Sequence, residues 1–247
     1  MIKFFRRIRY NLMEQNKTGK YLKYALGEIL LVMLGILLAL QVNNWNQERK
    51  NLEKEKYFLR SIKSSIELSQ TEFDRVIEGA EHISSSADTL FILLAQNNME
   101  QLKGIVLDSL LRGSSDYSLI SLNDGGIQEI LNTGSLDLIK DDRIRLHLAS
   151  WDDRLHKIRK FEAETEKLAR DYQDYLMHYT DVKRVMSRTS DGFIIPSKKM
   201  QLLADPILTN YLAKIASIHE SMHEMYIEEK AVMDSLNLLI DNFLVND

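Results

Sequence analysis

Two histidines and a glutamate near the carboxyl end of the sequence have the spacing of a zinc-peptidase motif. His219-Glu220-Ser221-Met222-His223 matches the pattern H-E-x-x-H. On a helix, His219 and His223 lie one turn apart on the same face, so both imidazoles can bind one Zn²⁺. Glu220 is then the general base that activates a metal-bound water. Read alone, the motif indicates a metallopeptidase.

The residues around this motif favour a structural interpretation. Glu228 lies about 13 Å along the same helix from His219, too far to complete a zinc site. Glu224 follows the second histidine, where such peptidases usually carry an uncharged residue. We therefore interpret His219 and His223 as flanking an apolar stripe on a polar helix face. We predict no enzyme activity, catalytic residue, metal or cofactor, and keep the zinc peptidase as an alternative.

A second group with possible chemistry is aromatic. Tyr172, Tyr175, Tyr179 and Trp151 occur at helical spacing, which is typical of core packing between helices. The same four side chains can also line a pocket. A helical domain that binds a small ligand is therefore a further alternative.

The composition indicates which elements position these residues. The 247-residue chain has no Cys and only 2 Pro, with 45% apolar and 28% charged residues. The lack of Cys excludes thiolate sites and disulfides, and the scarcity of Pro favours long helices. Residues 1–24 hold seven basic residues and one acidic residue. Since the whole chain carries −4, the remainder carries −10.

An apolar stretch follows the basic end. Residues 25–42 contain one ionisable residue, Glu28, and as a helix they reach about 27 Å, roughly the hydrocarbon thickness of a bilayer. We predict a transmembrane helix over residues 24–44, with Trp45 at the interface and Glu28 extending to it. A signal peptide and a buried core helix are the weaker interpretations. Gly35 and Ala39 permit close approach of a second helix.

The distribution of charge predicts the topology. Basic residues stay on the cytoplasmic side, so residues 1–23 are expected to be cytoplasmic and residues 45–247 periplasmic. Lys3, Arg6, Arg7 and Arg9 alternate with apolar residues, as in a short helix on an anionic membrane surface. A disordered basic tail is the other interpretation. The basic cluster is small, so we expect no nucleic-acid partner.

The residues around the apolar stretch resemble a known family. Gly19–Glu28, the apolar run Ile29–Leu40 and Gln41–Asn46 look like the amino-terminal signature of small Bacteroidota membrane proteins that carry a domain of unknown function. The resemblance covers about residues 1–50, and Asn132–Ile139 resembles the family more loosely. It implies one amino-terminal span and a helical extracytoplasmic part. It implies no activity and no catalytic residues.

Three long apolar stripes follow the span, separated by short irregular segments. The first runs over residues 47–96, with bends expected at Gly79 and Ser84–Ser86. The second begins near Asp141 and continues to Met186, and the last begins at Pro206. The short segments include a helix from Met99 to Leu111, turns at Asn123–Gly126 and Asn132–Gly134, and a loop at Ser187–Ser197. The predicted fold is all-α, with one amino-terminal transmembrane helix followed by an elongated antiparallel helical bundle.

The steps of each stripe alternate between three and four residues, which predicts the buried positions. In the first stripe they are Leu52, Leu59, Ile62, Ile66, Phe73, Val76, Ala80, Ile83, Ala87, Leu90 and Leu94, with Glu55 and Ser69 filling the gaps. In the last they are Leu208, Tyr211, Ile215, Ile218, Met222, Met225, Val232, Leu236, Leu239 and Phe243, interrupted by Glu229. The function that this organisation favours is a membrane-anchored, non-catalytic interaction module, scaffold or sensor-like. It would pack against itself or a membrane protein partner.

Overall fold

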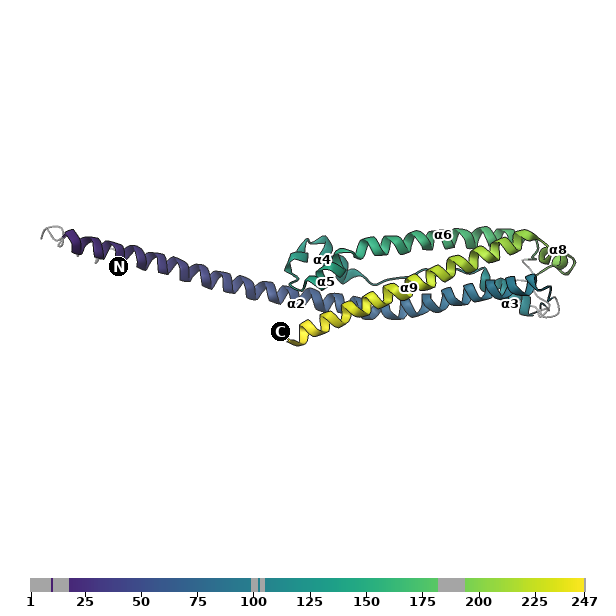
Figure 1. Ribbon diagram of the computed structural model, residues 1–247, viewed down its shortest axis with the longest axis horizontal. Helices are drawn as coiled ribbons and strands as arrows, with labels where there is room; N and C mark the ends of the chain where they lie inside the picture. Colours follow the sequence, from purple (N-terminus) through teal and green to yellow (C-terminus); the bar gives the residue numbers. More distant parts are fainter. Residues whose placement is uncertain (1–9, 11–17, 99–101, 103–104, 182–193, 247) are drawn as a thin grey trace. The chain divides into compact units, whose positions relative to one another are not determined.

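The described part of the chain is almost entirely helical (Figure 1). The computed structural model describes residues 10, 18–98, 102, 105–181 and 194–246. The elements are α2 (Thr18–Ala95), α3 (Ile105–Ser114), α4 (Gly125–Asn132), η1 (Ser135–Leu138), α5 (Asp142–Ala149), α6 (Trp151–Met177), η2 (Pro196–Lys198), α8 (Lys199–Leu203) and α9 (Pro206–Asn246). The described residues form no strand, only an isolated bridge between Thr180 and Ile194. The predicted all-α fold is confirmed.

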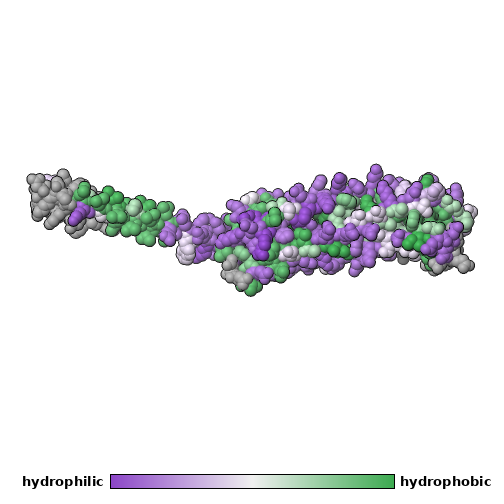
Figure 2. All heavy atoms as spheres, viewed as in Figure 1, coloured by the Kyte–Doolittle hydropathy of each residue, from purple (hydrophilic) through white to green (hydrophobic). Residues whose placement is uncertain are grey.

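The chain divides into two compact units, Met1–Glu55 and Lys56–Asp247. In the first unit, α2 carries the apolar stretch, and its large apolar side chains are exposed (Figure 2). Among the described residues, α2 is the one helix long and apolar enough to cross a membrane, and its most apolar window is 0% buried. An apolar surface of this extent is unfavourable in water, which suggests membrane anchoring.

The predicted anchor residues lie on this exposed surface. Trp45 is 64% exposed, Glu28 is partly exposed and Ala39 is exposed. A Cβ added at Gly35 meets nothing within 4 Å. Their roles in anchoring and helix pairing remain predictions. The basic residues assigned to the membrane surface lie outside the described residues, namely Lys3, Arg6, Arg7 and Arg9.

The second unit is a helical bundle in which α9 runs antiparallel to both α2 and α6. Its inter-helix side-chain pairs fall in opposite numerical order: Lys63–Asp241, Gln70–Asp234 and Asp74–Lys230 join α2 to α9, and Arg154–Glu229 and Glu162–Tyr226 join α6 to α9. Since α2 and α6 are both antiparallel to α9, they run in the same direction.

The predicted core positions of α2 in this unit are confirmed from Leu59 to Leu90, whereas Leu94 is only half-buried. Every apolar residue predicted between residues 59 and 90 is at most 2% exposed: Leu59, Ile62, Ile66, Phe73, Val76, Ala80, Ile83, Ala87 and Leu90. Ser69, which fills a gap in the stripe, is 1% exposed. The alternating step therefore identifies the buried face of a helix that packs on two neighbours.

The predicted core positions of α9 are confirmed only in part. The residues predicted at 211, 218, 225, 232 and 239 are only half-buried. The buried positions beside the confirmed ones are instead Leu212, His219, Tyr226, Glu229, Met233 and Ile240. The helix is apolar at three positions of each heptad rather than two, so the pattern fits two neighbouring faces. Which of the two faces is buried depends on polar residues of α9, such as Tyr226 and Glu229, that bond to α6 only in the folded bundle.

The second predicted long helix is two helices. It breaks at Ser150, whose hydroxyl bonds to the carbonyl oxygens of Leu146 and His147, and such local bonds compete with helix continuation. The break lets Trp151 enter the core at 1% exposure. Helix α6 ends at Met177. The predicted stripe beyond residue 181 lies outside the described residues.

Several predicted breaks differ from the structure. Helix α2 is unbroken through Gly79 and Ser84–Ser86, so the bends expected there do not interrupt it. Gly125 and Gly126 open α4 rather than forming a turn, and the predicted loop at 187–197 includes the start of η2 at Pro196. The break at Gly134 is confirmed, since its φ is +64°, a conformation that favours glycine.

The first long helix ends where it was predicted to end. Asn97 has a φ of +56°. The N–H of Asn98 donates to the carbonyl of Leu93, and that of Asn97 to Leu94. This pair of bonds is the Schellman motif, which satisfies the last carbonyls of a helix.

Between α3 and α4 the chain is extended, and the distance it covers explains why. Gly113 lies against Ser86, and Gly126 lies against Ser61. The 25 residues from Ser61 to Ser86 rise about 38 Å along α2, whereas the 13 residues from Gly113 to Gly126 would rise only about 20 Å as a helix. An extended chain of that length reaches about 43 Å. We call the central residues of this segment, Tyr117–Asn123, the strap.

Candidate functional site

The metallopeptidase motif does not form a metal site in the described part of the chain. His219 is 3% exposed in the core, His223 is half-buried and Glu220 points outward. Burial lowers the pKa of His219 to about 4, opposed by the charge of Asp116. Among the described residues, no group of three or more His, Asp or Glu side chains is placed to hold a metal ion. The zinc-peptidase alternative therefore has no third ligand there.

The predicted aromatic group separates into two places. Tyr175 and Tyr179 both donate to Oδ2 of Asp205, at 2.9 and 2.8 Å. Tyr172 stacks on Tyr175, with ring centroids 6.3 Å apart. Trp151 belongs to the other apolar cluster. The tyrosines pack at the start of α9, where Asp205 also accepts the N–H of Ile207 at 2.9 Å and so caps the helix.

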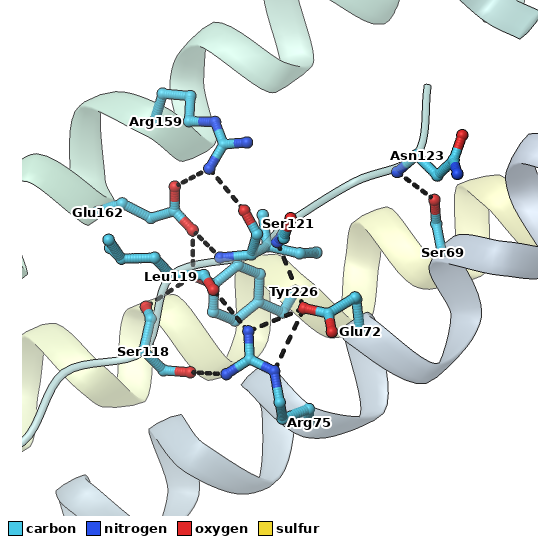
Figure 3. Close-up of polar contacts among 11 residues, drawn as sticks. Ser69, Glu72, Arg75, Ser118, Leu119, Ser121, Asn123, Arg159, Glu162 and Tyr226 are labelled. Atoms are coloured by element: carbon cyan, nitrogen blue, oxygen red, sulfur yellow. Dashed lines mark hydrogen bonds and ion pairs between the residues drawn. The ribbon is translucent and has the colours of Figure 1, made fainter. Parts of the chain in front are cut away.

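A polar network contributed by α2, α6 and α9 surrounds the strap (Figure 3). Its centre is Glu162 of α6, which is 3% exposed. Oε1 of Glu162 accepts the main-chain N–H of Ile120 at 2.6 Å and the hydroxyl of Tyr226 at 2.8 Å. Oε2 accepts Arg159 Nη1 at 2.8 Å. Both oxygens of this carboxylate are therefore engaged by donors.

Two carbonyl oxygens of the strap, those of Ile120 and Ser118, also accept hydrogen bonds from α6 and α9. Arg159 Nη1 donates to the carbonyl oxygen of Ile120 at 2.7 Å. The hydroxyl of Tyr226 lies 3.3 Å from the carbonyl oxygen of Ser118. Burial, followed by the charge of Glu162, raises the pKa of Tyr226, so its hydroxyl remains protonated and donates.

Helix α2 binds the strap from the opposite side. Arg75 Nη2 donates to the carbonyl oxygen of Leu119 at 2.6 Å. The same guanidinium bonds to Glu72 at 2.9 Å and, as the largest cause, lowers the pKa of that carboxyl. The N–H of Ser121 lies 3.4 Å from Glu72 Oε2. Arg75 Nη2 and Glu72 Oε2 therefore form the ion pair and at the same time bind the strap backbone.

Two serines of α2 form further hydrogen bonds with the backbone at the carboxyl end of the strap and just beyond it. Ser69 Oγ accepts the N–H of Asn123 at 3.1 Å, and Ser65 Oγ accepts the N–H of Gly126 at 3.0 Å. Within the described residues, no main-chain to main-chain hydrogen bond involves the strap. Its backbone groups instead bond to side chains of three helices, which satisfies polar groups that would be costly to bury unpaired.

The strap alternates between the core and the surface. Ser118 and Ile120 are buried, at 9% and 2% exposure, and Leu122 is half-buried. Leu119 and Ser121 point outward. This two-residue period is that of an extended chain with one buried face. The arrangement is chemically suited to hold an extended backbone and one branched aliphatic side chain.

A separate ion pair lies further along α6 and α9. Arg154 Nε contacts both carboxylate oxygens of Glu229 at 3.0 and 2.9 Å. Burial raises the pKa of Glu229, while Arg154 opposes the shift. Arg154 also donates to the carbonyl of His147, which ties α6 to the end of α5. This pair explains why an acidic residue occupies a core position of α9.

No motif in the sequence predicted the strap network. Glu162 falls at a core position of its stripe, between Ile158 and Thr165, all three with at most 3% exposure. A charged residue at such a position is the one available signal, since a buried charge needs a partner. The partner in the strap is the main-chain N–H of Ile120, which lies in a segment whose alternation is too short to predict a strand.

In the part of the chain that the structure describes, fold and network define an all-α protein with one candidate membrane helix and a bundle that binds an extended segment of its own chain. The chain belongs to the family described as "Family of unknown function (DUF6090)", which it matches over residues 28–178. The resemblance to a family of unknown function is thereby confirmed and extends well beyond residue 50. The match includes the strap and all of α6. No curated protein and no solved structure matches the chain.

Proposed function

We propose that this protein is a single-pass protein of the cytoplasmic membrane whose bundle lies in the periplasm and acts as a non-catalytic interaction module. The bundle binds a second copy of the chain or another membrane protein through helix packing. The observation that carries this proposal is an apolar stripe on α9 that the bundle leaves half-buried.

The stripe consists of every seventh residue of α9, at predicted core positions that are only half-buried: Tyr211, Ile218, Met225, Val232 and Leu239. It lies beside α6, because the rings of Tyr175 and Tyr211 are 5.3 Å apart. Leu168 and Ile218 line a groove of about 240 Å³ between the two helices. A further helix that covers such a groove buries apolar area on both sides, which favours association.

The rim of the groove carries charges of both signs. Glu164, Lys167 and Asp171 of α6 face Lys214 of α9 across the groove. A mixed rim around an apolar floor is typical of protein interfaces, where the rim sets orientation and the floor supplies affinity.

Membrane anchoring and orientation have separate support. The exposed apolar window of α2 suggests the anchor, and the basic residues that precede it favour a cytoplasmic amino terminus. The natural chain has no Cys, so single cysteines can report topology. With a membrane-impermeant maleimide on intact cells, we expect Ser217→Cys to be labelled and Tyr10→Cys to stay unlabelled until the cells are lysed. The opposite pattern contradicts the orientation.

The interaction itself is tested by affinity capture after mild detergent extraction. We expect a defined membrane partner or a self-oligomer with the natural chain. Ile218→Gln and Met225→Gln should each reduce its yield roughly tenfold, because central apolar contacts dominate such interfaces. Ser217→Gln and Glu224→Gln, at exposed neighbouring positions, are the matched controls. A strictly monomeric protein without a partner at native levels overturns the proposal.

A further inference from the structure

The strap occupies a site that recognises backbone rather than sequence. Ile120 is bound at both its N–H and its carbonyl oxygen, at 2.6 and 2.7 Å. Leu119 is bound at its carbonyl oxygen at 2.6 Å. These contacts do not depend on the strap's side chains, so another extended chain can satisfy the same donors and acceptors.

The side chains that the site accepts are few. Ile120 fills the one fully buried position of the strap, at 2% exposure. A Cβ added at Gly79 of α2 would meet Oγ of Ser118 at 3.0 Å, so the strap packs closely on α2 at position 118, and this close packing favours a small residue there. The site therefore selects a small residue, then any residue, then a branched aliphatic residue.

The site cannot remain empty at low cost. Glu162 at 3% exposure and Tyr226 at 0% exposure lie on two helices and would lose their strap partners together. A buried carboxylate with a missing donor is strongly unfavourable. A polar lining of this kind is stable with one backbone segment in place and can exchange it for another that supplies the same groups.

We propose that the strap is an internal occupant of a peptide site, and that the bundle binds an extended segment of a partner protein there after the strap is displaced. This inference rests on the proposed function, because it names the kind of partner that the interaction module takes. The partner segment is extended and carries a branched aliphatic residue two positions after a small one. It is distinct from the helix that the α6–α9 groove accepts.

The first test measures binding in trans with the full-length protein in detergent. The probe is a fluorescent, end-blocked peptide of residues Tyr117–Asn123, and the control peptide carries Asp in place of its isoleucine. Ile120→Asp loosens the protein's own strap, whereas Leu119→Asp changes an exposed neighbour and leaves it in place. We expect Ile120→Asp to bind the probe roughly tenfold more tightly than Leu119→Asp, and neither variant to bind the control peptide. Equal binding by the two variants overturns the proposal.

The second test closes the site covalently. The Cβ built at Gly79 lies 3.2 Å from the Cβ of Ser118, within a few tenths of an ångström of disulfide geometry. The double variant Gly79→Cys/Ser118→Cys joins strap to α2 when oxidised. Added to Ile120→Asp, it should abolish binding of the probe when oxidised, and reduction should restore it. Binding that is equal in both redox states overturns the proposal.

Hydrogen exchange on the unmodified protein keeps the proposal testable if Ile120→Asp does not fold. We expect the amides of Ile120 and Asn123 to exchange through local opening, at rates insensitive to low denaturant, while mid-α9 amides exchange only through global unfolding. Strap amides that exchange only with global unfolding overturn the proposal. Partner capture that survives strap closure but is lost in Ile218→Gln leaves the proposed function intact and removes only this site.

Discussion

The hydroxyl of Tyr226 on α9 donates to Oε1 of Glu162 on α6 at 2.8 Å, and that same oxygen accepts the N–H of Ile120 at 2.6 Å. One carboxylate thus joins two helices and the strap. Because Glu162 connects α6, α9 and the strap, its removal should destabilise all three elements.

Glu162→Ala should lower the free energy of unfolding by about 3 kcal/mol, because it leaves the Ile120 N–H and the Tyr226 hydroxyl buried without an acceptor. Glu162→Gln should cost less, since its amide oxygen still accepts. Urea unfolding of the full-length protein in detergent, followed by circular dichroism, measures both. Glu164→Ala, at an exposed position of the same helix, should change stability by less than about 0.5 kcal/mol. An equal effect at the two positions contradicts the role given to Glu162.

The helices and most of their buried faces follow from sequence because their signals are local. The stripe of α2 is apolar at two positions per heptad, and Leu59 to Leu90 are buried as predicted. In α9, Met225 and Tyr226 compete for the same face. Tyr226 is buried because Glu162, 64 residues earlier in the chain, accepts its hydroxyl. A pattern within one helix contains no information about that acceptor.

The strap illustrates the other limit. A lone extended segment pairs with no strand, so its residues show too short an alternation to be recognised. Gly79 and Ser86 were interpreted as bend sites, but their small size serves close approach: Gly79 contacts Ser118, and Ser86 contacts Gly113. A small residue in a helix can indicate that another segment packs closely there, but the sequence does not identify that segment.

The buried histidine predicts an acid-sensitive bundle. The pKa of His219 is lowered to about 4 from an ordinary value of 6.5, so the folded state favours the neutral ring. The unfolded state therefore takes up a proton as the pH falls below about 6.5, and stability falls until about pH 4, by at most about 3 kcal/mol. Above pH 6.5 this contribution is fully present.

His219→Asn removes this titration and keeps a polar side chain in the core. The difference in unfolding free energy between the natural chain and the variant, measured from pH 7 to pH 4, isolates the histidine from the carboxyl groups that both proteins share. We expect the advantage of the natural chain to shrink steadily over this range. A difference that does not vary with pH contradicts the burial of a neutral ring.

The cap of α9 yields a prediction at the other end of the bundle. Asp205 accepts the N–H of Ile207 and the hydroxyls of Tyr175 and Tyr179. Asp205→Ala should destabilise the protein by about 2 kcal/mol, since it removes a helix cap and the acceptor of two tyrosines. Asp205→Asn should lose only about half as much stability as Asp205→Ala. Thermal unfolding of the natural chain and the two variants gives the order of their melting temperatures. Equal melting temperatures for Asp205→Ala and the natural chain contradict the assignment.

The two glycines at the start of α4, Gly125 and Gly126, allow a test of whether a glycine is needed for close packing on α2 or only for its backbone conformation. A Cβ at Gly126 would lie 2.5 Å from the carbonyl oxygen of Ser61, whereas a Cβ at Gly125 meets nothing within 4 Å. Both residues are helical, so Gly125→Ala should be neutral or slightly stabilising. Gly126→Ala should cost about 2–3 kcal/mol, because α4 must move away from the backbone of α2. That movement also stretches the bond from the Gly126 N–H to Ser65 and should raise the exchange rate of the Asn123 amide in the strap. Equal stability and exchange in the two variants would show that α4 does not hold the end of the strap against α2.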